Sequence, residues 1–194
     1  MNLTLKNTFK KYETMAEVLM TQLFALLTAL DALEKEIFER NHALTLEKPS
    51  LNLPSHQVHP NWHALMEEYE ERFKAILEGK VTEKLLSRGY ATQYSQPSEY
   101  AYLDDEAFSV DFTMRKVDMA TIIIHYQQAL EMKHKFVLRL IEDKWLVDEK
   151  YYGLKMKTPG TWIECKTKIF KIKRAKYYGM ASTKKTQTKV QGAL

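Results

Sequence analysis

The sequence predicts an α+β protein in which helices come first and an antiparallel sheet follows. Up to residue 89, apolar side chains recur at spacings of three and four, which is typical of helices with one buried face. From residue 108 onward, apolar and polar side chains alternate, which is typical of strands. Tight turns separate the alternating segments, so the strands should pair as sequential hairpins.

A long helix is predicted from Phe9 to Arg40, because this segment lacks Gly and Pro and is rich in helix-forming residues. Its buried face comprises Leu19, Leu23, Leu26, Leu27, Leu30, Leu33 and Ile37. Polar residues interrupt the most apolar stretch, 15–33, which therefore falls short of the ~18–20 apolar residues of a membrane span. The polar start of the chain also differs from a signal peptide. We therefore expect a buried helix and no membrane contact.

Two shorter helices are predicted after a connector rich in proline and turn-forming residues. The first of them follows Asn61 and is closed by Gly79, since glycine readily adopts the left-handed conformation that ends a helix. The second starts at Thr82, a good N-cap residue, and ends at Gly89.

Four or five strands are predicted next, at residues 108–115, 121–128, 135–140, 144–152 and 161–172. The face assigned to the core comprises Phe108, Val110, Phe112, Met114, Ile122, Ile124, Tyr126, Phe136, Leu138 and Leu140. Asp111, His125 and Arg139 fall on the opposite, wetter face. Because sequential hairpins must bury one face, we expect a strongly curved antiparallel sheet that forms a cone around a helix. A cone can hold a small ligand or be filled with side chains.

The predicted organisation has four parts. Residues 1–43 form an N-terminal helical extension, 44–60 a connector loop, 61–175 the cone-shaped α+β domain and 176–194 a basic, flexible tail. The single cysteine, Cys165, excludes an internal disulfide and suits a reducing compartment, so we expect a cytoplasmic protein.

The charge is distributed unevenly along the chain. Residues 166–194 contain nine Lys or Arg and no Asp or Glu, whereas the whole chain carries only +4. A basic tail can bind nucleic acid, but no nucleic-acid-binding motif accompanies it, so a solvated tail is favoured.

The segment "HKFVLRLIEDKWLVDEKYYG" resembles the closing hairpin of nuclear-transport-factor-2-like proteins. In that superfamily one strand ends in a polar turn, and the next begins with Trp, an apolar pair and an acidic residue, as in Trp145-Leu146-Val147-Asp148. The resemblance covers about residues 60–172, and the long first helix and the basic tail lie outside it. It implies the cone fold, and no catalytic motif of the enzymatic members is carried over.

Within that superfamily the chain is most similar to the immunity proteins of bacterial polymorphic toxin systems. The segments "LMEEYEERFKAIL", "VTEKLLSRG" and "QPSEYAYL" carry this similarity. It implies a toxin inhibitor that works through protein–protein interaction with a cognate toxin domain, without a cofactor. Pairing of two copies through the sheet, which is frequent in this fold, stays an open alternative.

Candidate catalytic and metal-binding residues are few. His56, His59 and His63 are close in sequence, but Pro60 disrupts their helical register and no cysteine or carboxylate completes a zinc site, so a structural role is favoured. The face assigned to the core holds only one polar tip, that of Tyr126, which is the candidate pocket residue. We therefore expect no enzyme and no metal.

Partner binding is assigned to surface residues. Acidic groups beside aromatic rings suit protein recognition, because aromatic rings anchor a partner and charges steer it. The partner-binding candidates are Tyr100, Tyr102, Asp104, Asp105, Glu106, Asp111, Arg115 and Arg139. The sequence thus favours an immunity protein that occludes its toxin sterically and electrostatically. The alternatives are a small-molecule-binding or isomerase-like enzyme of the same fold, and an adaptor whose basic tail contacts nucleic acid.

Overall fold

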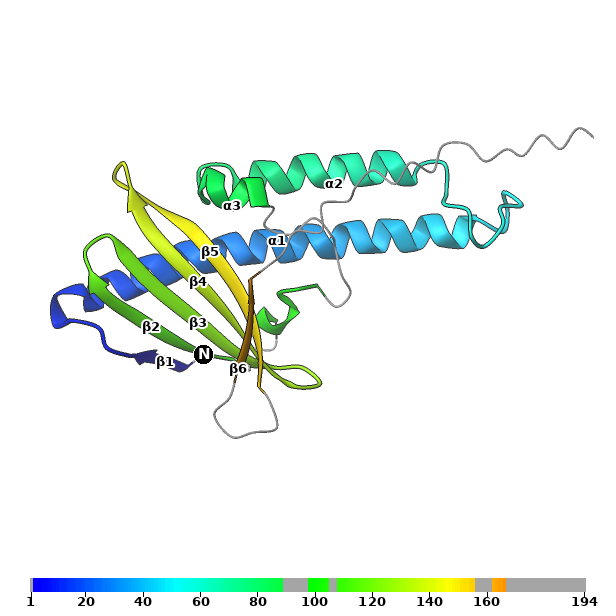
Figure 1. Cartoon of the computed structure of the whole chain (residues 1–194). Helices are drawn as coiled ribbons and strands as arrows, with labels where there is room; N and C mark the ends of the chain where they lie inside the picture. The colour runs from blue at the N-terminus through cyan, green and yellow to red at the C-terminus, as the bar shows by residue number, and fades with distance from the viewer. Residues whose placement is uncertain (1, 89–97, 105–107, 156–161, 167–194) are drawn as a thin grey trace, which may run out of the picture.

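The computed structural model describes residues 2–88, 98–104, 108–155 and 162–166 (Figure 1). The elements are β1 (Asn2–Leu5), α1 (Glu13–Glu47), α2 (Trp62–Leu77), α3 (Glu83–Arg88), β2 (Phe108–Lys116), β3 (Met119–Gln127), β4 (Glu131–Ile141), β5 (Lys144–Lys155) and β6 (Trp162–Lys166). Single 3₁₀ turns occur at Lys10–Tyr12 and Ala101–Leu103. The strand predicted over residues 161–172 is thus described only as β6, and the basic tail lies outside the described residues.

The six strands form one sheet in sequence order, β1 to β6. β2 to β6 pair antiparallel through sequential hairpins, as predicted, whereas β1 pairs with β2 in parallel. The α+β class is therefore confirmed. The sheet is not strongly curled, so the strong curvature and the closed cone that we predicted are not confirmed (Figure 1).

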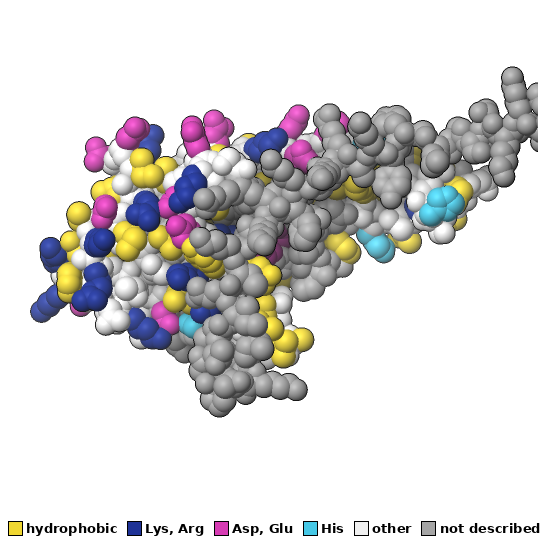
Figure 2. Space-filling model, in the orientation of Figure 1, with side chains coloured by type: hydrophobic (Ala, Val, Ile, Leu, Met, Phe, Trp, Pro, Cys, Tyr) yellow, Lys and Arg dark blue, Asp and Glu magenta, His cyan; other side chains and the backbone are white. Residues whose placement is uncertain are grey.

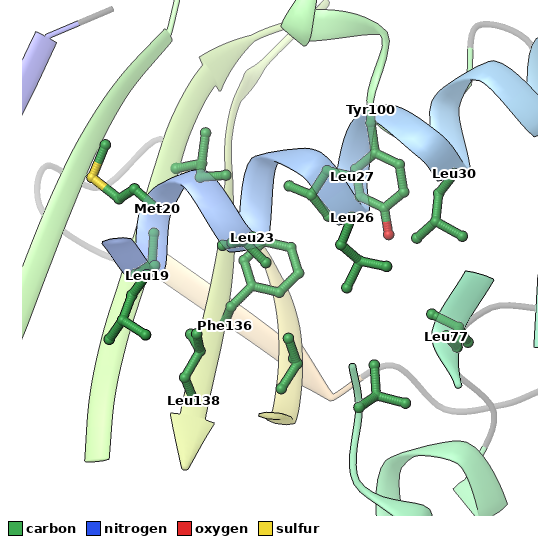
Figure 3. Close-up of a cluster of buried hydrophobic side chains, with 14 of the residues drawn as sticks. Leu19, Met20, Leu23, Leu26, Leu27, Leu30, Leu77, Tyr100, Phe136 and Leu138 are labelled. Atoms are coloured by element: carbon green, nitrogen blue, oxygen red, sulfur yellow. The ribbon is translucent and has the colours of Figure 1, made fainter. Parts of the chain in front are cut away.

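α1 crosses one face of the sheet and continues beyond it, where it lies beside α2 (Figure 1). All seven residues predicted for its buried face are at most 2% exposed. Figure 3 shows five of them, Leu19, Leu23, Leu26, Leu27 and Leu30, gathered in one core with Phe136 of β4 and with Tyr100. Because α1 and the sheet share this core, α1 is an integral layer of the domain. It also extends to Glu47, so residues 44–47 of the predicted connector are helical.

The N-terminal strand β1 was not predicted. It consists of four residues, which are too few to show an alternating pattern. The Lys6 N–H donates to the Phe112 carbonyl at 2.8 Å, and the Phe9 N–H donates to the Met114 carbonyl at 3.2 Å, so the chain stays attached to β2 beyond the strand. These bonds place Lys6 at the edge of the sheet face that α1 does not cover.

The predicted turn and cap residues Gly79, Thr82, Glu142 and Asp143 are confirmed, whereas Gly89 lies outside the described residues. Gly79, with φ of 66°, follows α2, and the Thr82 hydroxyl accepts the Leu85 N–H at 3.2 Å at the start of α3. Glu142 and Asp143 both have positive φ, 47° and 60°, as a two-residue hairpin requires.

Among the described residues, the segment Lys10–Glu47 is the one helix whose length and hydropathy would suffice for a membrane span. Half of its most apolar 18-residue window is buried inside the protein. A core helix gives the same signal, and the buried leucines of α1 account for its apolar character. The cytoplasmic location stays a prediction.

Candidate functional site

A pocket of about 320 Å³ opens where the segment 98–104 crosses the inner face of the sheet. Its described lining residues are Ser98, Glu99, Tyr126, Gln128, Met132, His134 and Tyr152. Tyr126, the residue assigned to a pocket from the sequence, is thus part of the wall.

Strand register explains why these side chains meet. His134 lies opposite Tyr152 and two residues from Phe136, so it shares the inner face with the core. Val137 of β4 pairs with Glu149 of β5, but the next residue, Leu138, pairs with Val147, so Asp148 is an extra residue in β5. This bulge turns Lys150 and Tyr152 inward, where a regular strand would place Glu149 and Tyr151.

Lys150 and Glu99 form the charged centre of the site. The Lys150 Nζ lies 2.5 Å from Glu99 Oε1 and donates to the Tyr100 hydroxyl at 2.7 Å. Its side chain is completely buried, so both of these acceptors are needed to offset the loss of water. Burial raises the pKa of Glu99, but Lys150, His134 and Tyr100 together outweigh burial, with Lys150 foremost, and hold this pKa below its usual value. Glu99 is therefore ionised at neutral pH.

His134 lies between two tyrosines. Its Nδ1 is 3.0 Å from the Tyr102 hydroxyl, and its Nε2 is 3.1 Å from the Tyr126 hydroxyl and 3.6 Å from Glu99 Oε1. Burial lowers the pKa of His134 to about 4, so the ring is neutral at pH 7. A neutral imidazole has one N–H, so it donates to one tyrosine and accepts from the other. The rings of Tyr102 and Tyr126 stack 4.1 Å apart.

Two acidic residues of α1 hold the segment 98–104 in place. Glu34 accepts the Glu99 N–H at 2.8 Å, and Asp31 accepts the Ser98 hydroxyl and pairs with Lys35 at 2.6 Å. Burial raises the pKa of Glu34 to about 7. The helix, the segment and the sheet are therefore joined by one buried polar network.

None of the three titratable groups His134, Glu99 and Glu34 combines a pKa near 7 with a place in the pocket wall. A general base works best with a pKa near the working pH and a clear path to its substrate. His134 titrates near 4, Glu99 is tied to Lys150, and Glu34 is buried outside the pocket wall. Within the parts of the chain that the structure describes, no group of three or more His, Cys, Asp or Glu residues could hold a metal ion.

The predicted acidic and aromatic surface patch is divided by the structure. Tyr100 and Tyr102 are only 1% and 5% exposed, so they do not present their rings to a partner, and this part of the prediction is corrected. The sequence "YAYL" forms a 3₁₀ turn that packs both rings inward. Asp104 is exposed and pairs with Lys35 at 2.5 Å. Asp105 and Glu106 lie outside the described residues.

The other three partner-binding candidates lie on or beside the outer face of the sheet. Asp111 pairs with Lys6 at 2.7 Å and with His125 at 2.8 Å. Arg139 donates to Asp148 at 2.7 Å, and Arg115 is exposed, with its guanidinium 5.6 Å from the Phe9 ring centroid. Figure 2 shows many Lys and Arg side chains over the sheet end of the molecule, with Asp and Glu between them.

The sequence interpretation missed the central residues of the pocket. His134 continues the alternation of Phe136 and Leu138, and this signal would have placed it inside. Lys150 had no such signal, because the bulge that turns it inward is not visible as a pattern. Glu99 comes from a segment between elements, so only the folded structure brings it to Lys150.

Comparison with known proteins gave no relative: no family model matches the chain, and no curated protein or solved structure matched it.

Proposed function

We propose that this chain is a cytoplasmic immunity protein that binds and neutralises a cognate bacterial toxin by steric and electrostatic occlusion. The observation that carries this proposal is the internal pairing of the inner polar groups. Lys150, Glu99 and His134 bond to one another and to tyrosines, so they stabilise the fold and leave no obvious acid–base pair for catalysis. We therefore propose that the chain acts by binding a partner.

The proposal includes an architecture similar to that of nuclear-transport-factor-2-like proteins. Three helices precede a meander of antiparallel strands, and the Glu142-Asp143 hairpin leads into Trp145. The departures are the parallel edge strand β1 and the weaker curvature of the sheet. The helices, the strand meander and the hairpin support the resemblance in element order. A closed cone remains part of the proposal.

A rigid support favours tight binding, because little entropy is lost when the interface is already ordered. The network that joins Asp31 and Glu34 of α1 to the segment 98–104 fixes the backbone that leads to exposed Asp104. A carboxylate held there can attract a basic toxin and speed its association.

The first experiment is capture of the tagged full chain from its native cells, with bound proteins identified by mass spectrometry. We expect one stoichiometric partner that is encoded beside this gene and whose toxicity the chain suppresses on co-expression. Recovery of no specific partner would count against the proposal.

A pair of charge reversals then tests the surface. Asp104→Lys should slow association with the partner about tenfold at low salt, because the steering charge is reversed. Asp118→Lys, at an exposed turn between β2 and β3, is the matched control and should leave the rate nearly unchanged. Equal rates for both variants would place the interface elsewhere.

A second candidate function, binding of a small molecule, is favoured by the pocket beside Tyr126. Its volume lies near the lower end of the ~300–1,000 Å³ of ligand sites. A screen of metabolites by thermal shift would support this candidate if a ligand raised the unfolding temperature of the wild-type chain but not of a Gln128→Trp variant.

A further inference from the structure

We propose that the pocket beside Tyr126 receives an arginine side chain of the partner protein. This inference rests on the proposed function, since it names a contact by which the toxin is recognised. The inference is argued from the charge of the pocket, the hydrogen bonds of Tyr126 and the exposed ring of Tyr152 at the rim.

The charge of the pocket favours a cation. Glu99 is ionised, lines the pocket and remains 27% exposed despite its pairing with Lys150. Asp104 belongs to the segment 98–104, and Asp31 and Glu34 of α1 bond to the start of this segment. Lys35 pairs with Asp31 and Asp104. Among these described side chains, four carboxyl groups, including Glu99, thus share the two ammonium groups of Lys35 and Lys150. The half-protonation of Glu34 near pH 7 still leaves an excess of negative charge.

The hydroxyl oxygen of Tyr126 can accept a hydrogen bond from a ligand that carries only donors. A tyrosine oxygen can donate one hydrogen bond and accept others. When Tyr126 donates to Nε2 of neutral His134, Nδ1–H donates to Tyr102, and the Tyr126 oxygen keeps acceptor capacity at the pocket wall. A guanidinium group has five N–H donors and no acceptor, so it complements both this oxygen and the Glu99 carboxylate.

The rim of the pocket suits a flat cation on a hydrocarbon stem. The Tyr152 side chain is 42% exposed, and Met132 adds an apolar wall. A guanidinium stacks on an aromatic face, and its aliphatic stem packs against apolar groups. With a volume of about 320 Å³, the pocket has room for one long side chain. The same segment leads to exposed Asp104, which we propose as a steering charge, so the pocket adjoins the proposed interface.

The decisive variants are Tyr152→Ala, which removes the rim, and Gln128→Trp, which fills the pocket. Tyr152 and Gln128 are both exposed, so both variants should fold. Tyr151→Ala is the matched control, because the neighbouring side chain points to the other face of the sheet. We expect the two pocket variants to weaken binding of the captured toxin about tenfold or more and the control to change it less than about twofold.

A second measurement uses the free protein. The probe is N-acetyl-arginine-methylamide, with the glutamine analogue as the neutral control, and the readout is the methyl resonance of ¹³C-labelled Met132. We expect the arginine probe alone to shift this resonance, and the shift to disappear in Gln128→Trp. Glu99→Gln should also abolish the shift, because the probe loses its carboxylate partner. The spectrum of this variant must first show a folded protein, since Lys150 loses its counter-charge.

The two measurements separate this inference from the proposed function. If a toxin partner binds both pocket variants as tightly as wild type, the inference is wrong and the immunity function stands. If no toxin partner exists but the arginine probe binds, then both the immunity function and the proposal that a partner's arginine enters the pocket are wrong. The pocket would then bind a small free cation. Loss of toxin binding together with a Met132 shift by the probe supports the inference.

Discussion

A cluster that combines a carboxylate, a lysine and a histidine lies against each face of the sheet, in very different surroundings. The inner trio consists of Glu99, His134 and Lys150, and the outer trio of Lys6, Asp111 and His125. The lysine–carboxylate distances are similar, 2.5 Å inside and 2.7 Å outside. The side chains of Lys150 and His134 are 0% and 2% exposed, whereas those of Lys6 and His125 are 56% and 28% exposed.

The comparison teaches that chemical composition does not fix the role of an ionic cluster. In the inner trio, the completely buried Lys150 ammonium has lost its water and depends on the Glu99 carboxylate, so removal of either member is costly. In the outer trio, water and salt can replace the partner, so each contact contributes little. The inner trio is therefore expected to define the fold around the pocket, and the outer trio to be adjustable.

The largest effect is expected for the buried lysine. Lys150→Met removes the counter-charge of Glu99 and should lower the free energy of unfolding by ~3–5 kcal/mol, which urea denaturation would measure. The matched variant Lys6→Met should cost at most about 1 kcal/mol. Equal losses for the two variants would remove the distinction between the two trios.

The next effect concerns pH and the buried acid behind the inner trio. Burial raises the pKa of Glu34 to about 7 from 4.5 in the unfolded chain, so the folded state binds the extra proton. The stability that this group contributes is present below pH 4.5 and is lost as pH rises through 7. Relative to Glu34→Gln, wild type should lose on the order of 3 kcal/mol between pH 4.5 and pH 8.

The comparison with Glu34→Gln isolates this one group. Burial lowers the pKa of His134 to about 4, which acts in the opposite direction, because the stability that His134 contributes is lost as pH falls from 6.5 to 4. Both proteins carry His134, so its contribution cancels in the difference. The exposed Glu39→Gln on the same helix is the control. A difference between wild type and Glu34→Gln that does not change with pH would refute the assignment.

A smaller effect is expected for the two histidines. His134→Leu leaves the Tyr126 hydroxyl without its ring partner in a buried site and should cost about 2–3 kcal/mol. His125→Leu, at the half-exposed outer position, should cost less than about 1 kcal/mol. Thermal unfolding followed by circular dichroism would compare them, and His134→Gln, which keeps a donor and an acceptor, should recover part of the loss.

These contrasts also mark what a single sequence can reveal. The spacing of Leu19, Leu23 and Leu26 predicted the buried face of α1, because each signal lies within one turn of helix. The alternation from Phe108 to Met114 likewise predicted the inner face of β2. Element boundaries were less certain, and α1 extends beyond its predicted end.

The pocket depended on features with no local signal. Lys150 faces inward because of a bulge, and Glu99 reaches it across 51 residues of chain. Tyr100 and Tyr102 read as surface anchors, because acidic neighbours suggested exposure, but a 3₁₀ turn packs their rings against His134. His134 continues an apolar alternation, so a stricter use of periodicity would have found this part of the site.

The smallest effect is expected in the outer trio, and salt dependence reveals it best. Lys6 and His125 outweigh the effect of partial burial and hold the pKa of Asp111 below its usual value. Lys6→Ala should therefore cost a few tenths of a kcal/mol to about 1 kcal/mol at low salt, and this difference from wild type should shrink at 1 M salt. For Lys150→Met, most of the difference should persist at high salt, because the Lys150 ammonium is completely buried. If the two differences responded to salt alike, the Lys150–Glu99 pair would be as open to solvent as the outer trio, and the distinction between the two trios would be wrong.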